Sequence, residues 1–281
     1  MTMIEQAGLQ SRPVMGDGIA DCTIFSTEMR PAARRVMLVA AIAAGAGIAL
    51  ALRGRVETPV AVSGLLAGLA FAGGLLSTWS PCGYSSLCLL RPSGRYSAQS
   101  LLRWTPTFLV HGLGYAIGAV ILGLLLGGAG QLLGADGVTT GALLGIGGAG
   151  VLYGAHQLRL IPAPYPQRRA QVPHDARQRF PSWVVGAIYG LSLGLNYLTY
   201  VQTPILYLVT ACALLSGSPV LAIALFALFN LGRFLPMAVN YLPLSDIAVQ
   251  KWLARRQEAA ALMDGVLLSA AGALLLTLAL I

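Results

Sequence analysis

The sequence predicts an all-α integral membrane protein with about seven transmembrane helices. Apolar residues make up 56% of the chain and charged residues only 10%, whereas charged residues form about a quarter of an average soluble domain. Several runs without charge reach the roughly twenty residues that a helix needs to cross a bilayer. The 34 glycines fit this class, because small residues let membrane helices approach closely. The composition therefore excludes a soluble globular domain.

The expected spans follow the apolar runs in order. The first, Val36 to Leu52, is long for a signal peptide and no small-residue cleavage site follows it, so we expect a retained helix. Proline breaks two later spans, at Pro81 and at Pro204, because proline removes a backbone donor and clashes with the preceding turn. The six later spans are expected at 60–90, 104–133, 138–158, 183–215, 219–242 and 259–281.

These spans divide the chain into a tail, one additional helix and a membrane domain. The tail is polar and is expected to lie in the cytoplasm. A basic, proline-rich loop joins two halves of the membrane domain. The boundaries are 1–35 for the tail, 36–58 for the N-terminal helix and its loop, and 59–281 for the six-helix domain, with halves 59–158 and 183–281 joined by loop 159–182.

Glycine spacing suggests that the two halves are repeats. Gly64-x-x-x-Gly68 precedes the first break, and Gly186-x-x-x-Gly190 precedes the second. Three helices separate the two starts, so the second copy would be inverted relative to the first. Inverted 3+3 repeats with paired broken helices place a functional site near the membrane midplane.

The basic residues predict the orientation. With the N-terminus inside, the inside segments hold fifteen arginines and lysines, whereas the outside loops hold only Arg53 and Arg55. By the positive-inside rule, the chain is expected in the inner membrane of a bacterium with a cytoplasmic N-terminus and a periplasmic C-terminus. The net charge of +8 then reflects topology and contact with the lipid bilayer. We expect no binding of nucleic acid.

The segment Trp79-Ser80-Pro81-Cys82-Gly83 carries the strongest chemical signal. Pro81 breaks the helix, and Gly83 permits backbone conformations that other residues resist. Cys82 then lies on broken backbone, which membranes tolerate only where protein or a water-lined cavity supports it. A thiol at such a point is a candidate redox group. A kinked helix that contains a small apolar cysteine is an alternative of equal weight.

Cys88 and Cys212 are the candidate partners of Cys82. In a regular helix Cys88 would lie about 9 Å further along the axis, whereas a disulfide needs Cα atoms within about 7 Å. That pair therefore requires unwound backbone. Cys212 follows Pro204 by eight residues and approaches only if the two broken helices cross favourably. Both cysteines are otherwise small buried apolar residues.

A few polar side chains fall within the expected spans. Arg233 is the costliest, since an ionisable group in a span usually faces a cavity or a partner, unless it snorkels from a helix end. His111 is a candidate proton relay, or else a packing residue. The three amides either line a cavity or join helices by hydrogen bonds: Asn196, Gln202 and Asn230. No metal-ligand spacing and no nucleotide loop occurs, so we expect no metal and no cofactor.

Three segments resemble the DsbD/CcdA family of transmembrane thiol–disulfide transporters. The run from Gly74 to Cys82, Gly-Leu-Leu-Ser-Thr-Trp-Ser-Pro-Cys, is similar to the family's first helix. The run from Thr107 to Gly123 is similar to its second helix, and Leu231-Gly-Arg-Phe-Leu-Pro236 to its fifth. From Val60 onward, the resemblance implies an inverted-repeat core that passes electrons between two cysteines, one at each break. The chain departs from this pattern at the second break, where Ile205, or Val201 in a shifted alignment, takes the place of the second cysteine.

The run from Trp79 to Cys88, the additional N-terminal helix and the length together resemble a narrower family of methylamine-utilisation membrane proteins. This resemblance implies an accessory protein that is needed to make active methylamine dehydrogenase. The small subunit of that enzyme is exported and cross-linked by many disulfides, so the implied partners are the small subunit and other maturation proteins. The implied chemistry is thiol–disulfide exchange through Cys82.

Two alternatives use the same broken helices. The first is a transporter for a small molecule or for a reduced thiol. The second is an assembly partner without redox chemistry. In each case we expect an accessory role rather than an enzyme.

Overall fold

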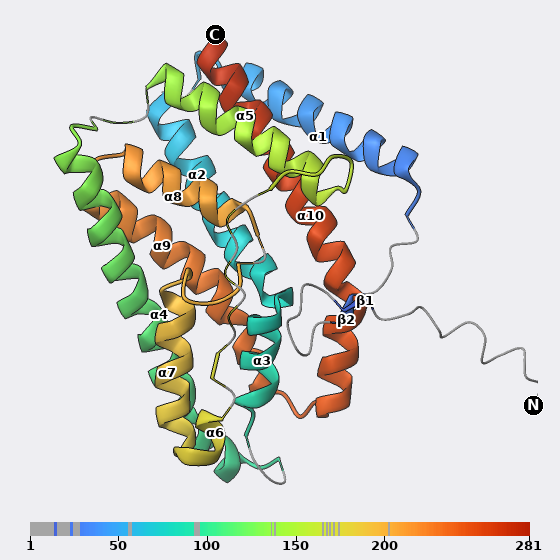
Figure 1. Ribbon diagram of the computed structural model, residues 1–281, viewed down its shortest axis with the longest axis vertical. Helices are drawn as coiled ribbons and strands as arrows, with labels where there is room; N and C mark the ends of the chain where they lie inside the picture. The colour runs from blue at the N-terminus through green and yellow to red at the C-terminus, as the bar shows by residue number, and fades with distance from the viewer. Residues whose placement is uncertain are drawn as a thin grey trace, which may run out of the picture.

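The computed structural model is almost entirely helical (Figure 1). It describes residues 14–15, 23–24, 29–55, 58–92, 96–135, 137, 139–164, 166, 168, 170, 172–173, 175–201 and 203–281. At 14–15, 23–24, 58–59, 81–82 and 84–85 only the backbone is described. Most of the predicted polar tail therefore lies outside the described residues.

The elements follow one another along the chain, with the longest connection of the membrane domain between α5 and α6. Two strands of two residues each, β1 (Val14–Met15) and β2 (Thr23–Ile24), pair antiparallel with Val14 opposite Ile24. The helices of the first half are α1 (Pro31–Leu52), α2 (Thr58–Leu76), the 3-10 turn η2 (Ser77–Trp79), α3 (Pro81–Leu89), α4 (Ala98–Leu132) and α5 (Thr140–Gln157). Those of the second half are α6 (Ala176–Arg179), α7 (Ser182–Gly194), α8 (Ile205–Leu215), α9 (Pro219–Phe234), the 3-10 segment η3 (Leu235–Tyr241) and α10 (Asp246–Leu280).

Five helices in the described part of the chain are long and apolar enough to cross a membrane. They are α1, Val60–Trp79, α4, Pro219–Tyr241 and α10. The prediction of an all-α membrane protein is thereby confirmed. The remaining two expected spans correspond to α5, with 18 residues, and to the pair of shorter apolar helices α7 and α8. The number of seven spans stays a prediction.

Both predicted breaks lie at the prolines. The chain leaves α2 through η2 and begins α3 at Pro81, where the Ser80 hydroxyl accepts a hydrogen bond from the Gly83 N–H at 3.0 Å. In the fifth span α7 ends at Gly194, and α8 begins directly after Pro204. Proline at the start of a helix lacks only a donor that would be unpaired anyway. Each proline therefore begins a new short helix instead of bending a continuous one.

Gly83 has a different role from the one that the sequence suggested. It lies inside α3 in helical conformation, so the break does not depend on an unusual backbone angle at this residue. A Cβ atom at this position would lie 2.5 Å from the Thr78 carbonyl oxygen. Glycine is required here because the end of η2 occupies the space of a side chain.

The last helix begins earlier than predicted, at Asp246 rather than at Ala259. Ser245 caps it by accepting a hydrogen bond from the Ala248 N–H at 3.2 Å. The basic residues Lys251 and Arg255 therefore lie on the helix itself. Lysine, arginine, alanine and glutamine are good helix formers, so the polar segment extends the span. Similarly, α4 begins at Ala98 instead of Trp104, after a capping box formed by Ser97 and Ser100.

The helices pack in a pattern that the two halves share. Helix α4 packs against α7 and α9, α2 packs against α9, and α10 packs against α5. Exchanging α2 with the α7–α8 pair, α4 with α9 and α5 with α10 leaves these pairings unchanged. The additional helix α1 lies across the outer side of α10 (Figure 1). This symmetry favours the predicted inverted repeat, which stays a prediction.

Backbone contact at glycines sets the distance between α2 and α9. A Cβ atom added to Gly74 would lie 1.9 Å from the Phe229 carbonyl oxygen, and one on Gly232 would lie 2.2 Å from the Phe71 carbonyl oxygen. Only glycine allows such an approach in a membrane helix pair.

The glycine pairs that suggested the repeat lie in different environments. A Cβ atom on Gly64 or Gly68 would meet nothing within 4 Å. In contrast, a Cβ atom on Gly190 would lie 2.2 Å from the His111 carbonyl oxygen of α4. The packed glycines of α2 are therefore not the ones that match α7 in spacing.

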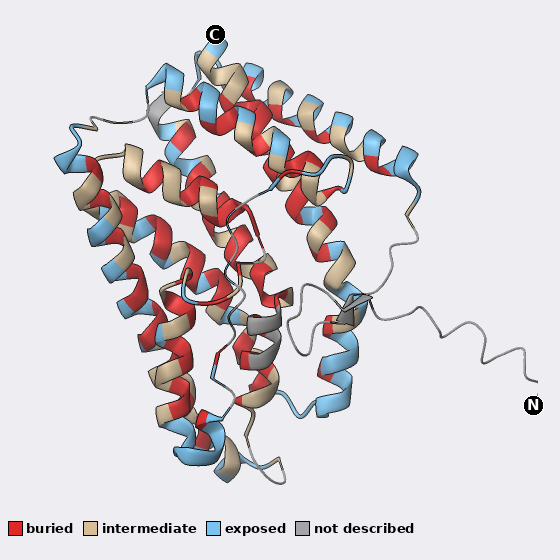
Figure 2. Ribbon diagram, in the orientation of Figure 1, coloured by how far each residue is buried: buried red, intermediate tan, exposed pale blue. Residues whose placement is uncertain are grey.

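Buried side chains fill the centre of the bundle, and exposed ones run along its outer faces (Figure 2). The exposed residues of α4 include Leu109, Leu113 and Leu125, which are each more than half exposed. A soluble helix would carry polar residues on such a face. These apolar outer surfaces are the ones that a lipid bilayer covers.

We expect Gly74→Ala to destabilise the fold and Gly68→Ala to leave it intact. The new methyl group at position 74 pushes α9 away and should lower the free energy of unfolding by about 1–3 kcal/mol. At position 68 alanine meets open space and, as the better helix former, should change that free energy by less than about 1 kcal/mol. Loss of circular dichroism on titration with sodium dodecyl sulfate measures both. Equal stabilities would contradict the close approach of α2 and α9.

Candidate functional site

His111 connects the two broken spans through α4. Its Nε2 atom lies 3.2 Å from the Ser86 hydroxyl of α3, and its Nδ1 atom lies 2.9 Å from the Gly186 carbonyl oxygen of α7. A carbonyl only accepts, so Nδ1 carries the hydrogen and Nε2 accepts from Ser86. The imidazole is completely buried. The sequence suggests either a proton relay or a packing residue at position 111. The structure shows His111 joining α4 to α3 and α7 by hydrogen bonds.

Arg233 of α9 reaches the end of α7. Its Nη1 atom donates to the Leu193 carbonyl oxygen and to the Asn196 Oδ1 atom, both at 3.2 Å. Leu193 lies in the last turn of α7, where unpaired carbonyls carry partial negative charge. Arg233 is only 6% exposed, so it does not snorkel to the surface. Arg233 therefore caps the C-terminal end of α7, which is the first helical segment of the fifth expected span.

Asn196 and Asn230 complete this network. Asn196 has a φ of +53°, a left-handed conformation that asparagine adopts more readily than most residues. Its Nδ2 atom donates to the Asn230 Oδ1 atom at 3.0 Å. The Nδ2 atom of Asn230 donates at 2.9 Å to the carbonyl oxygens of Tyr115 and Gly194. The predicted polar residues of α9 and the second break therefore form one cluster, whereas Gln202 lies outside the described residues.

No acid in the described part of the chain pairs with the charge of this cluster. The hydrogen bonds of Arg233 go to neutral oxygens, and its Nε atom is buried without a partner in the described part of the chain. The guanidinium is therefore a fixed positive group inside the bundle. Such a group is costly in a membrane, and the end of the α7 dipole offsets part of this cost.

Cys82 occupies the second position of α3, after Ser80 and Pro81. Its side chain lies outside the described part of the structure. Cys88, near the other end of α3, is half-buried beside a small cluster of Leu87, Val249 and Leu253. The backbone between the two cysteines is regular helix, so they are about 9 Å apart along the axis. The unwound backbone that a Cys82–Cys88 disulfide requires is not present.

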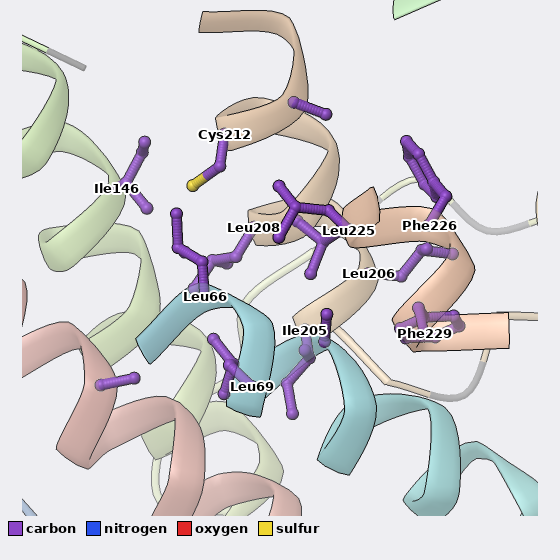
Figure 3. Close-up of a cluster of buried hydrophobic side chains, with 14 of the residues drawn as sticks. Leu66, Leu69, Ile146, Ile205, Leu206, Leu208, Cys212, Leu225, Phe226 and Phe229 are labelled. Carbon is purple, nitrogen blue, oxygen red and sulfur yellow. The ribbon is translucent and has the colours of Figure 1, made fainter. Parts of the chain in front are cut away.

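Cys212 of α8 lies in the main apolar core. Figure 3 shows its thiol beside Ile146 and Leu66, and the side chain is 2% exposed. Leu66 lies ten positions before the end of α2 at Leu76, which corresponds to roughly 15 Å of helix before the first break begins. The structure therefore does not bring Cys212 to the first break. Its surroundings are those of a small apolar core residue.

The sequence analysis missed Asp264. This residue of α10 is 3% exposed, and its Oδ1 atom accepts a hydrogen bond from the Thr203 hydroxyl at 2.5 Å. Thr203 directly precedes the second proline and also accepts from the Ile205 N–H at 3.1 Å. The signal was available, because an acid inside an apolar run of twenty residues is a candidate functional group. Counting only arginine and lysine when assigning the spans overlooked it.

Comparison with known proteins identifies the family. The methylamine utilization protein MauF of Methylorubrum extorquens is 64% identical over 281 residues, which cover 99% of each chain. MauF of Paracoccus versutus is 58% identical and MauF of Paracoccus denitrificans 57% identical, each over 94% of both chains. The chain belongs to the MauF family. No family model matches it, and no solved structure matches it significantly.

The sequence similarity to MauF covers nearly the whole chain and therefore includes the additional helix α1. A wider relationship to the DsbD/CcdA family stays a prediction. Within this MauF-family fold, two polar groups stand at the breaks: the Arg233–Asn196–Asn230 cluster at the end of α7, and the Thr203–Asp264 pair at the start of α8.

We expect Arg233→Ala to destabilise this MauF-family protein, because it leaves the Leu193 carbonyl and the Asn196 amide oxygen buried with fewer donors. Each such loss costs about 1–3 kcal/mol. The matched control is Arg256→Ala, since Arg256 is exposed on α10 and should change stability by less than about 0.5 kcal/mol. Unfolding in sodium dodecyl sulfate measures both variants. If the Arg233 variant is as stable as the Arg256 variant, Arg233 does not cap α7.

Proposed function

We propose that this chain is an inner-membrane accessory protein of methylamine utilisation, and that it supports the maturation of the exported small subunit of methylamine dehydrogenase. The observation that supports this proposal most directly is the sequence similarity to MauF over nearly the whole chain. The apolar spans support a place in the membrane.

The proposed orientation puts the N-terminus in the cytoplasm and the C-terminus in the periplasm. The starts of α4 and α10 and the short helix α6 lie at one end of the molecule (Figure 1). Each of these segments carries arginine or lysine: Arg103, Arg177, Arg179, Lys251, Arg255 and Arg256. Basic residues on one side support that side as cytoplasmic.

The proposed chemistry is thiol–disulfide exchange through Cys82. Its place in the first turn of α3 supports this role, because unpaired N–H groups at a helix start favour an anion. The thiolate is the reactive form of cysteine. Positions 82 and 86 are four residues apart and so share one face of α3. Ser86 is hydrogen-bonded to His111, which puts a group able to handle protons near this face.

Among the cysteines that the structure describes, the positions of Cys88 and Cys212 favour an exchange that uses Cys82 alone. Cys88 is too far along α3, and Cys212 lies in the core beside Leu66. A single thiol supports exchange that restores its starting state. The Cys82 thiolate attacks a disulfide of the small subunit, a mixed disulfide forms and one partner thiolate leaves. A second partner thiolate then attacks the mixed disulfide, forms a new disulfide and releases Cys82, so no net oxidant or reductant is needed.

A second candidate is an assembly or transport role without redox chemistry. Ile205 stands where the two-cysteine pattern expects a thiol, and this isoleucine is completely buried in the apolar core. The same broken helices would then bind the small subunit or a small molecule without covalent exchange.

Replacement of Cys82 by serine separates the two candidates. We expect Cys82→Ser to abolish active methylamine dehydrogenase and to leave its small subunit with incorrect disulfides, while Cys88→Ser and Cys212→Ser retain activity. The matching measurement is enzyme activity in cells, together with the amount of each membrane protein as a control for folding.

A trapped intermediate tests the exchange directly. Rapid acid quenching and alkylation should preserve a band that contains both this chain and the small subunit, that disappears on reduction and is absent in Cys82→Ser. If Cys82→Ser cells make active enzyme at normal levels, the exchange mechanism is refuted and the non-redox role takes its place.

A further inference from the structure

A small pocket lies where both helix breaks meet α10. Its lining includes Trp79 before the first break, Thr203 before the second, Gln157 at the end of α5 and Asp264 of α10. The cavity volume is about 10 Å³, which is enough for one water molecule. The pocket is distinct from the Arg233 cluster and from the proposed thiol.

Two buried polar atoms in this pocket lack partners in the described part of the chain. One is the Oδ2 atom of Asp264, and the other is the Nε1 atom of Trp79. The Oδ1 atom of Asp264 is satisfied by the Thr203 hydroxyl. An unpaired carboxyl oxygen on a side chain that is 97% buried requires an explanation. A bound proton or a bound water supplies one.

Among the described residues that line the pocket, none carries a charge that could stabilise an ionised Asp264. Helix α10 packs against α1, α2, η2, α3 and α5, and the described lining that they contribute is Leu76, Trp79 and Gln157. His156 of α5 is not among the described lining residues, and its Nδ1 atom accepts a hydrogen bond from the Ala163 N–H. Arg91 at the end of α3 pairs with Asp246, 2.9 Å away. On α10 itself, Arg255 and Arg256 are exposed, and Glu258 does not line the pocket.

We propose that Asp264 is a proton-binding site, and that its neutral form holds the second helix break against α10. An isolated ionised carboxylate in an apolar site is costly, and neutralisation removes most of this cost. The neutral acid keeps Oδ1 as an acceptor for Thr203 and turns Oδ2 into a donor for a water or for an amide oxygen. The proposal goes beyond the function proposed for Cys82 and does not depend on it.

A proton fits this pocket better than a metal ion does. Sodium or a divalent cation needs several oxygen ligands around it. Much of the lining is apolar, from Leu76, Ala260 and Ala261. Thr203 already uses its hydroxyl hydrogen on Asp264 and accepts from the Ile205 N–H. The side-chain oxygens that remain for a metal come from Asp264, Gln157 and Gln257, and they are fewer than the roughly six that a divalent cation takes.

Loss of the proton acts on both breaks. The Thr203 hydroxyl and the Gln157 side-chain amide are the donors that the described lining offers to an ionised Asp264, and neither carries a charge. Full ionisation therefore requires more water than the cavity holds, so the segment around Thr203 must move or the pocket must open. Trp79 lines the same pocket and directly precedes Ser80 and Pro81. Protonation of one side chain thereby biases the conformation at the start of α3 and at the start of α8.

Infrared difference spectroscopy of the full chain in lipid vesicles tests this site. Exposed carboxyl groups are ionised above about pH 6, so a carboxylic acid band that vanishes between pH 6 and 9 reports a protected acid. We expect such a band in the native protein and in Asp175→Asn, a control at an exposed aspartate. We expect its loss in Asp264→Asn. Absence of the band from the native protein, or its persistence in Asp264→Asn, would overturn the proposal.

Two further measurements remove the remaining ambiguities. Thr203→Val keeps the acid but deletes its hydrogen bond, so the carboxylic acid band should remain and shift in frequency. This variant assigns the band to Asp264 even if Asp264→Asn does not fold. Repeating the titration with potassium replaced by sodium should leave the transition unchanged. A transition that follows sodium concentration at constant pH would assign the pocket to a sodium ion and refute the proton site.

Discussion

The constraint on which this structure depends is that broken backbone in an apolar medium needs partners supplied by the protein. A continuous helix satisfies its own N–H and C=O groups, but each interrupted span exposes several of them. At the end of α7 the free carbonyls of Leu193 and Gly194 are bonded by Arg233 and Asn230. At the starts of α3 and α8, the hydroxyls of Ser80 and Thr203 accept from the N–H groups. Six buried polar residues in the described part of the chain are explained by these two breaks: Ser80, Asn196, Thr203, Asn230, Arg233 and Asp264.

Close helix packing makes this satisfaction possible. Helix α4 touches the backbone of α7 at Gly190 and Gly194, and α2 touches α9 at Gly74 and Gly232. At these separations short side chains such as asparagine reach across to neighbouring carbonyls. The glycines and the amides therefore form one arrangement: without the glycines, Asn230 could not bond both Tyr115 of α4 and Gly194 of α7.

The fold class and the two breaks could be predicted from the sequence, because composition and proline act locally. The partners of Arg233 could not, since they depend on how α9 crosses α7 and on the left-handed conformation of Asn196. The apolar run predicts a last span from position 259, but α10 begins at Asp246, because Lys251 and Arg255 are good helix formers that extend a helix without adding to its apolar length. The predicted glycine match failed to identify the packed face of α2, because in a glycine-rich chain spacing alone does not distinguish Gly68 from Gly74.

The two breaks carry different chemistry, and this difference limits the mechanism. A pathway for electrons across the membrane would need an exchangeable thiol at each break, but α8 begins with the buried Ile205. The second break carries the carboxyl of Asp264 instead, bonded through Thr203. A proton can be bound there without any electron carrier. The proposed thiol exchange at the first break and the proposed proton binding at the second are thus separable by mutation: Cys82→Ser should leave the carboxyl band intact, and Asp264→Asn should leave the thiol able to react. If each substitution abolished both properties, the two breaks would act as one site.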